Sequence, residues 1–335
     1  MEAMYRAKNG EYVLMEMKNR SKMQDPAEVY TVDMRKELKN GNRSILSEQL
    51  QRLMKERLEK KEQTMLFLNR RGYSGFVSCR ECGHVIKCPH CDVSLSVHRD
   101  GKMRCHYCGY EQTHVKICPE CGSDHIGEFR AGTQQIEEIV KTVFPQARVL
   151  RMDMDTTRQK DSHEKILSAF ANEEADVLVG TQMIVKGHDF PNVTLVGILA
   201  ADMSLYTDDY RSGERTFQLL TQAVGRAGRG DKKGEAVIQT YSPDHYAIAT
   251  SAAQDYEAFY SQEMAYRRLL GYPPAVALLT IHMACPREDV VEQAAGRAAG
   301  WVEDWKAGQE QAGPGRGLQL IGPVNAPVYK VNDIY

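Results

Sequence analysis

Cysteine is the residue type whose spacing in this sequence points most directly to chemistry. Of the nine cysteines in 335 residues, eight fall between Cys79 and Cys121. They form four C-x-x-C pairs, separated by five, thirteen and nine residues: Cys79/Cys82, Cys88/Cys91, Cys105/Cys108 and Cys118/Cys121. A C-x-x-C turn lets two thiolates grip one tetrahedral ion, so four such turns predict two closed zinc sites that are structural and not catalytic.

The order of the four pairs bears on how they combine. The gap of five residues between the first two pairs disfavours a shared ion, which leaves nested or alternating pairing. We favour nesting, because the inner pairs then close a hairpin around Asp100-Gly101. Gly83, Gly109 and Gly122 each follow a pair, where glycine permits the positive φ that such turns often need. The competing interpretations are a disulfide or redox array, and histidine ligands among the six histidines of this region, which we interpret as surface residues.

A second informative run, Gln222 to Arg229, has the pattern Q-x-x-G-R-x-G-R. Its glycines allow close backbone approach, and Arg226 and Arg229 can present two guanidinium groups to one phosphate. Such cations stabilise the charge that develops in phosphoryl transfer. A solvated basic helix end is the alternative, but the full octet favours a catalytic set of Gln222, Arg226 and Arg229. We expect Arg229 to act like an arginine finger and Arg226 to orient the γ-phosphate.

A third run extends from Gly180 to Phe190 and follows an apolar segment that we expect to be a strand. Gly180 and Thr181 would then lie at the carboxyl edge of a sheet, where a hydroxyl and backbone amides can hold a nucleic-acid phosphate. The tetrapeptide Lys186-Gly187-His188-Asp189 would link that contact to the nucleotide. An ordinary loop between strand and helix is the alternative interpretation.

The elements that would position these runs alternate between strand and helix. Ser47 is a good N-cap for a helix whose apolar positions include Leu50 and Leu53. The sequence predicts strands at 65–68, 147–152, 176–180, 193–199 and 236–240, and helices at 133–144, from 161 and at 214–224. This alternation is typical of a parallel sheet in an α/β domain. Because sheet elements lie on both sides of the cysteine block, we expect that block to be an insertion.

From residue 244 onward the pattern of the sequence changes. Apolar positions over 256–269 fit an amphipathic helix that Tyr272-Pro273-Pro274 would end. Residues 277–283 alternate as in a strand, and a helix with Trp301 and Trp305 should follow. These elements predict a separate, small α+β domain.

The composition is that of an ordinary globular protein, with 42% hydrophobic and 26% charged residues. No apolar run approaches the roughly 18 residues needed to span a bilayer, and the N-terminus lacks a signal-peptide core. We therefore expect a cytoplasmic protein with no membrane partner. The net charge of −2 requires any DNA binding to come from local patches.

Together these motifs resemble the second RecA-like lobe of a superfamily-two helicase. The full set resembles the primosomal protein N′ (PriA) family of bacterial replication-restart helicases, and the likeness covers nearly the whole chain. The runs that carry it are 66–73, 79–84, 88–92, 180–190 and 222–229. The family resemblance implies one zinc held by the outer cysteines (Cys79, Cys82, Cys118 and Cys121) and a second held by the inner ones (Cys88, Cys91, Cys105 and Cys108).

The resemblance also implies a function and a domain plan. The family unwinds DNA 3′ to 5′ with ATP and Mg²⁺, recognises stalled or abandoned forks and initiates primosome assembly. Its partners are forked DNA with single-strand/double-strand junctions, primosome proteins and single-strand-binding protein. We expect a remnant of the first helicase lobe or a linker at 1–24, the second RecA-like lobe at 25–78 and 128–243, the zinc insertion at 79–127, and a truncated C-terminal domain at 244–335.

The sequence departs from the family in one respect. It contains no G-x-x-x-x-G-K-[ST] and no D-E-x-H, the motifs whose lysine and acid hold phosphates and magnesium. We therefore expect the chain to correspond to the C-terminal half of a family member and to lack ATPase activity alone. The alternative is a non-enzymatic, zinc-dependent DNA-binding protein on an inactive RecA-like scaffold. The arginine octet favours the helicase, and a Walker lysine encoded upstream of Met1 would separate the two.

Overall fold

The fold was analysed in a computed structural model of the chain. The structure describes residues 1–17, 26–68, 77–90, 93–98, 101–105, 108–128, 132–153, 156–157, 162–184, 189–206, 209–230, 232–311, 318–326 and 334.

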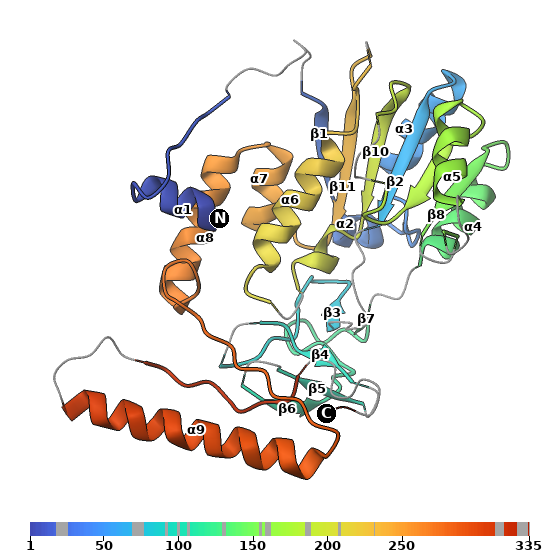
Figure 1. The fold of residues 1–335 in the computed structure, drawn as a ribbon. Helices are drawn as coiled ribbons and strands as arrows, with labels where there is room; N and C mark the ends of the chain where they lie inside the picture. The colour runs from blue at the N-terminus through green and yellow to red at the C-terminus, as the bar shows by residue number, and fades with distance from the viewer. Residues whose placement is uncertain are drawn as a thin grey trace.

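The centre of the molecule is a parallel sheet of six strands (Figure 1). The strands are β1 (Glu28–Asp33), β2 (Gln63–Leu68), β8 (Val149–Met152), β9 (Val177–Gly180), β10 (Val193–Leu199) and β11 (Glu235–Thr240). They lie in the order β1-β11-β10-β2-β9-β8, and every neighbouring pair is parallel. The predicted parallel sheet is thus confirmed, with its predicted strands displaced by no more than two residues at either end.

Helices cover both faces of this sheet, because successive strand residues point to opposite sides. Leu66 faces α3 (Glu48–Glu59) and α4 (Thr133–Val143). Phe67 faces the opposite layer, which contains α5 (Ser162–Ala171), α6 (Ser212–Val224), α7 (Tyr246–Ala252) and α8 (Tyr256–Leu270). The Ser47 hydroxyl accepts from the Leu50 amide at 3.3 Å, so the predicted cap of α3 is confirmed.

Three short helices complete this part of the chain: α1 (Glu2–Lys8), α2 (Met34–Lys39) and the 3-10 helix η1 (Ala201–Ser204). The Lys8 ammonium pairs with Glu257 at 2.8 Å and lies 4.3 Å from the centre of the Tyr260 ring, which fixes α1 beside α8. Residues 11–15 form no strand and are exposed.

The cysteine-rich segment forms a small module inserted between β2 and α4. Strands β3 (Val77–Cys79) and β7 (Ile126–Glu128) pair at its base. Strands β4 (Ser96–Val97), β5 (Lys102–Arg104) and β6 (Glu111–Thr113) form a separate antiparallel sheet within it. The predicted insertion is therefore confirmed. The module lies at the end of the parallel sheet where β1 runs into α2, the carboxyl end of the strands (Figure 1).

The C-terminal region differs from its prediction in one element. Residues 277–283 form no strand, and no strand of the described chain pairs with them. Helices α7 and α8, which follow the predicted domain boundary at residue 244, pack on the sheet together with α6. The long helix predicted around Trp301 and Trp305 is present as α9 (Glu288–Gln311).

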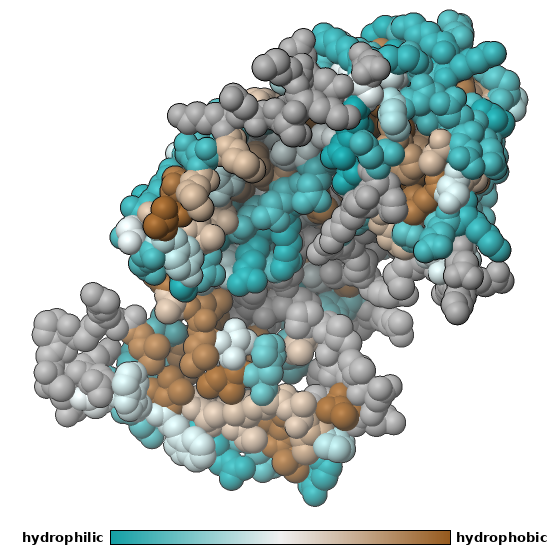
Figure 2. Space-filling view, turned by 45° about the horizontal axis from the view of Figure 1, so that its top comes forward, coloured by the Kyte–Doolittle hydropathy of each residue, from teal (hydrophilic) through white to brown (hydrophobic). Residues whose placement is uncertain are grey.

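Helix α9 has an apolar, exposed surface. Trp301 and Trp305 are 70% and 58% exposed, and the segment before the helix exposes Leu279 and Ile281. Figure 2 shows hydrophobic residues gathered on the lower part of the molecule, the part that contains α9. The helices of the described chain include none with the length and apolarity that a bilayer crossing requires.

Candidate functional site

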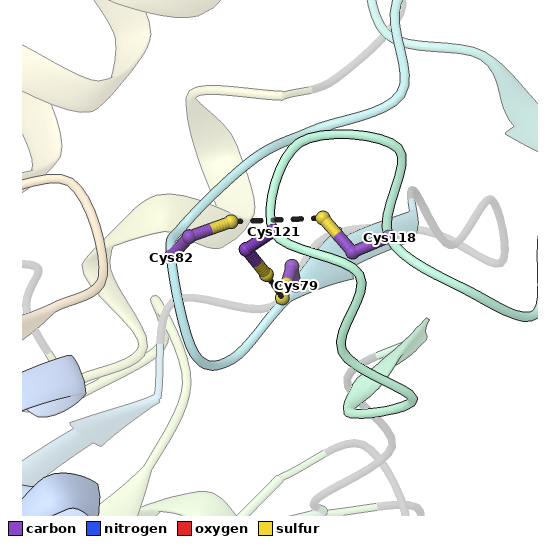
Figure 3. Close-up of side chains that lie close together, drawn as sticks. All are labelled: Cys79, Cys82, Cys118 and Cys121. Atoms are coloured by element: carbon purple, nitrogen blue, oxygen red, sulfur yellow. Dashed lines mark hydrogen bonds between the residues drawn. The ribbon is translucent and has the colours of Figure 1, made fainter.

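The outer cysteines come together at the base of the module. The Sγ atoms of Cys79, Cys82, Cys118 and Cys121 all lie within 4.8 Å of one another. Cys79 and Cys121 are 3.6 Å apart at sulfur, and so are Cys82 and Cys118. Figure 3 shows the four sulfur atoms turned inward between two loops. A tetrahedral zinc with Zn–S bonds of about 2.3 Å places its sulfurs about 3.8 Å apart, so the four thiols fit a zinc ion and not a disulfide.

The inner cysteines form a second cluster farther into the module. Cys88, Cys105 and Cys108 lie within 4.8 Å of one another at sulfur, with Cys88 and Cys108 at 3.5 Å. Cys91, the fourth member expected here, lies outside the described residues. The structure therefore groups the outer two pairs in one cluster and the described cysteines of the inner two pairs in another, as nested pairing predicts.

The turns of these pairs have the local geometry that zinc knuckles need. The amides of Gly83, Gly109 and Gly122 each donate to the carbonyl of the first cysteine of their pair, at 2.9–3.0 Å. Their φ angles are +82°, +77° and +72°, a region that L-residues rarely adopt. The glycine after each of these pairs is thus required by the turn itself.

The electrostatics of the outer cluster favour a thiolate at Cys118. Burial alone would raise the pKa of Cys118, but the backbone amides of Cys121 and Glu120 that donate to its sulfur bring that pKa down to about 7. The amide of His84 donates to the Cys82 sulfur at 3.4 Å, but burial raises the pKa of Cys82 to about 12. Since the thiolate is the form that binds metal, Cys118 is the member of the cluster that its backbone amides prepare for zinc.

The arginine run begins where α6 ends. Gly225 terminates the helix, and the Arg229 Nε donates to the Gly225 carbonyl at 2.9 Å. Arg226 is half-buried, and burial, together with the nearby charge of Arg229, lowers the pKa of its guanidinium. Gln222 is exposed on the last turn of the helix.

The loop that carries the arginines is packed against the end of the third run. The Gly228 amide donates to the Val193 carbonyl at 3.0 Å, and a Cβ on Gly230 would lie 2.4 Å from the Pro191 carbonyl oxygen. Asp189, two residues before Pro191, lies 3.8 Å from the Arg229 guanidinium. The structure therefore brings Asp189 and the arginine pair together at the amino end of β10 and β11.

Gly180 and Thr181 lie elsewhere, at the carboxyl end of β9. A Cβ on Gly180 would approach the Met152 carbonyl oxygen to 2.7 Å, so only glycine fits between β8 and Ile184. Lys186, Gly187 and His188, which connect this point to Asp189, lie outside the described residues.

Sequence reasoning did not single out the residues between the module and the sheet. Asp202 is buried after β10 and accepts from the Thr240 hydroxyl at 2.7 Å and the Tyr241 amide at 2.8 Å. Burial raises the pKa of this carboxyl. An acid directly after an apolar strand is the one signal that could have drawn attention to it.

Comparisons with known proteins first define the class. Residues 126–231 match the family model of the helicase conserved C-terminal domain. Together with the parallel sheet and the arginine run at the end of α6, this match identifies a helicase motor lobe. Among solved structures, the E. coli DEAD-box protein SrmB bound to regulator of ribonuclease activity A is 12% identical, with 69% of this chain and 85% of that chain covered at a TM-score of 0.32. A TM-score this low adds nothing to the assignment.

Other matches define the family. Residues 88–112 match the model of the PriA DNA helicase Cys-rich region domain. Replication restart protein PriA of Bacillus subtilis (strain 168) is 48% identical, covering 100% of this chain and 41% of that protein. The proteins of the same name from Synechocystis and Haemophilus influenzae are 45% and 36% identical, covering 92% and 98% of this chain and 37% and 44% of those proteins. The chain belongs to the PriA family, binds zinc, and spans about two fifths of the length of these relatives.

Proposed function

We propose that this chain supplies the second motor lobe and the zinc module of an ATP-dependent 3′–5′ DNA helicase. The complete protein would recognise stalled or abandoned forks and initiate primosome assembly. The observation that supports this most strongly is the meeting of Asp189 and Arg229 at one end of the sheet, while Gly180 and Thr181 lie at the other. One continuous segment thus runs between a proposed nucleotide end and a proposed DNA end.

At the nucleotide end, Arg229 is the proposed finger and Arg226 orients the γ-phosphate. The partial burial of Arg226 strengthens the attraction of its guanidinium to a phosphate. Gln222 extends the same surface from the last turn of α6. ATP and Mg²⁺ would be held between these groups and the Walker residues, which this sequence does not contain.

At the DNA end, the Thr181 hydroxyl and the amides after Gly180 would hold a backbone phosphate. Lys186, Gly187, His188 and Asp189 would connect that contact to the arginines, a role proposed from the sequence pattern.

The zinc module is proposed to hold two ions, one in the outer cluster and one in the inner cluster completed by Cys91. All eight proposed ligands are thiolates, which closes both sites to chemistry and leaves the module a role in shape or contact. It lies at the carboxyl end of the sheet, the same end as Thr181. This placement favours work on the DNA strands or on partner proteins at the fork.

The domain plan follows from packing. We propose that the motor lobe extends to about residue 270, since α7 and α8 belong to its core, and that a C-terminal domain begins after it. The segment before β1 would belong to the first lobe or to a linker. The partners would be forked DNA, single-strand-binding protein and primosome proteins, in the bacterial cytoplasm where the chromosome replicates.

The test uses a chimeric helicase, in which this chain replaces the matching segment of the Bacillus subtilis relative. Arg226→Ala and Arg229→Ala should each abolish ATP-driven unwinding, by about 10³-fold or more in ATP turnover, and leave fork binding within a few-fold. Arg215→Ala is the matched control, because Arg215 lies on the same helix but pairs with Asp209 at 2.7 Å, away from the proposed nucleotide end.

A chimera that does not unwind forks would contradict the proposal. Near-normal ATP turnover in both variants would remove the arginines from the nucleotide site and favour an inactive scaffold that binds DNA through its zinc module.

A further inference from the structure

The first knuckle of the zinc module, Cys79 to Gly83, contacts the motor lobe. The Arg35 guanidinium, on α2 of the lobe, donates to the Cys82 carbonyl at 3.3 Å. Gly83 lies directly against the Tyr241 carbonyl oxygen, which a Cβ on Gly83 would approach to 2.6 Å. A backbone carbonyl in a hydrogen-bonded segment cannot rotate away as a flexible side chain can.

The lobe residues that the knuckle contacts are held in place by their own hydrogen bonds. The Tyr241 amide donates to the buried Asp202 carboxylate at 2.8 Å, and the Tyr206 and Ser242 hydroxyls lie 2.8 Å apart. The Ser94 hydroxyl, from the module, donates to the Tyr206 carbonyl. The knuckle therefore rests on residues fixed by their own hydrogen bonds.

A narrow crevice marks the line of contact. Ser78, Arg80 and Val85 line it on the module side, and Met203 and Tyr206 line it on the lobe side. Residues 69–76 and 129–131, the two connections between module and lobe, lie outside the described residues. Strands β3 and β7 pair with each other within the module, and the hydrogen bonds from Arg35 to the knuckle and from Ser94 to Tyr206 join described residues of the module and the lobe.

We propose that Gly83 is a positioning residue, whose close approach to Tyr241 seats the outer zinc knuckle on the carboxyl edge of the sheet and sets the orientation of the whole module. The expected effect on unwinding rests on the proposed function. The contact between Gly83 and Tyr241, called the seat below, is a property of this chain and can be tested without it.

The chain contains its own matched control. Gly122 follows the other pair of the same zinc cluster and has a φ of +72°, but nothing lies within 4 Å of its added Cβ. Gly83→Ala and Gly122→Ala therefore impose the same kind of backbone strain on the same metal site, and only the first collides with the lobe. Zinc content should be equal in the two variants.

The first measurement is hydrogen exchange in this chain, loaded with zinc. In Gly83→Ala the Tyr241 amide should lose protection by about tenfold or more, while the Cys105 amide, which donates to the Tyr110 carbonyl at 2.9 Å, should keep it. Gly122→Ala should leave the Tyr241 amide within about threefold of the parent chain. Arg35→Ala, which removes the donor to the Cys82 carbonyl from the lobe side, should act as Gly83→Ala does without changing the knuckle.

The second measurement uses the chimeric helicase described above. Gly83→Ala should reduce fork unwinding by about tenfold or more relative to Gly122→Ala, at ATP turnovers within about twofold of one another, because both variants strain the same zinc site and only the first collides with the lobe. Equal loss of Tyr241 protection in the two glycine variants would refute the seat. A selective loss of protection with unwinding unchanged would refute the positioning role. Because hydrogen exchange needs no helicase activity, a failure of the proposed function would be seen separately.

Discussion

His245 makes the stability of the motor lobe depend on pH. Its imidazole is the N-cap of α7, where Nδ1 accepts from the Ala247 amide at 3.2 Å. Burial, helped by the charge of Lys87, lowers the pKa of His245 to about 4. The ring also lies against the rings of Tyr246 and Tyr206, at 4.6 and 6.5 Å between centroids. A protonated imidazole cannot accept a hydrogen bond, so acid removes the cap and places a charge on a half-buried group.

The sign and the size of the effect follow from linkage. The folded-state pKa lies below the value of about 6.5 for an exposed histidine, so His245 contributes stability above that pH and loses it as the pH falls towards 4. Between pH 7 and pH 5 the free energy of unfolding should fall by about 2 kcal/mol through this residue alone. Over the same range an unperturbed histidine contributes nothing.

The assay compares the parent chain with His245→Asn, since asparagine is a good N-cap that does not titrate. Urea unfolding, followed by far-ultraviolet circular dichroism with saturating zinc, is measured at pH 7 and pH 5. Between pH 7 and pH 5 the free energy of unfolding of the parent should fall by about 2 kcal/mol more than that of the variant. His282→Asn, at an exposed histidine, should behave as the parent does. If the free energy of unfolding fell equally between pH 7 and pH 5 in the parent and in His245→Asn, the reasoning would be refuted. Any effect of acid on the zinc sites is common to both proteins and cancels in the comparison.

Three further outcomes are expected. Metal analysis should find two zinc ions per chain, and chelation should unfold residues 79–127 as measured by hydrogen exchange; a single ion alongside disulfides would contradict this. In the chimera, Cys88→Ser with Cys91→Ser should damage fork unwinding more than basal ATP hydrolysis, whereas equal loss of both would reduce the module to a support of the motor fold. Arg267→Ala should lower the free energy of unfolding by about 3–5 kcal/mol, because it leaves the buried Glu263 carboxylate without its partner at 2.8 Å, and Glu263→Gln in the same chain should restore part of the loss.

The sequence predicted the features of this fold that depend on local patterns. The buried run of β2 and the Ser47 cap of α3 are both properties of a few neighbouring residues. The three described knuckle glycines were predictable for the same reason, since the sign of φ is set within the turn. The clusters themselves follow from spacing, because each C-x-x-C turn brings its two sulfurs close before any tertiary contact forms.

Features that depend on partners distant in the sequence were not predicted. Helix α7 was missed because its seven residues form a helix mainly through the packing of Ala247 and Ile248 on the sheet. Residues 277–283 have the alternation of a strand, but a strand forms only where another strand can pair with it. The seat of the zinc module depends on Tyr206 and Tyr241, neither of which belongs to a motif.

The topology of the sheet explains why the zinc module lies at the carboxyl end of the strands, the end proposed above to bind DNA. The insertion leaves the chain directly after β2, and in a parallel sheet every strand ends at the same edge. A module inserted after β2 therefore lies at the same end of the sheet as Thr181 and at the opposite end from Arg226 and Arg229. A strand of six residues measures about 20 Å, twice the reach of an ionic interaction at physiological salt. Changes within the module can thus alter contacts with DNA while the arginines keep their geometry, provided that the sheet between them remains intact.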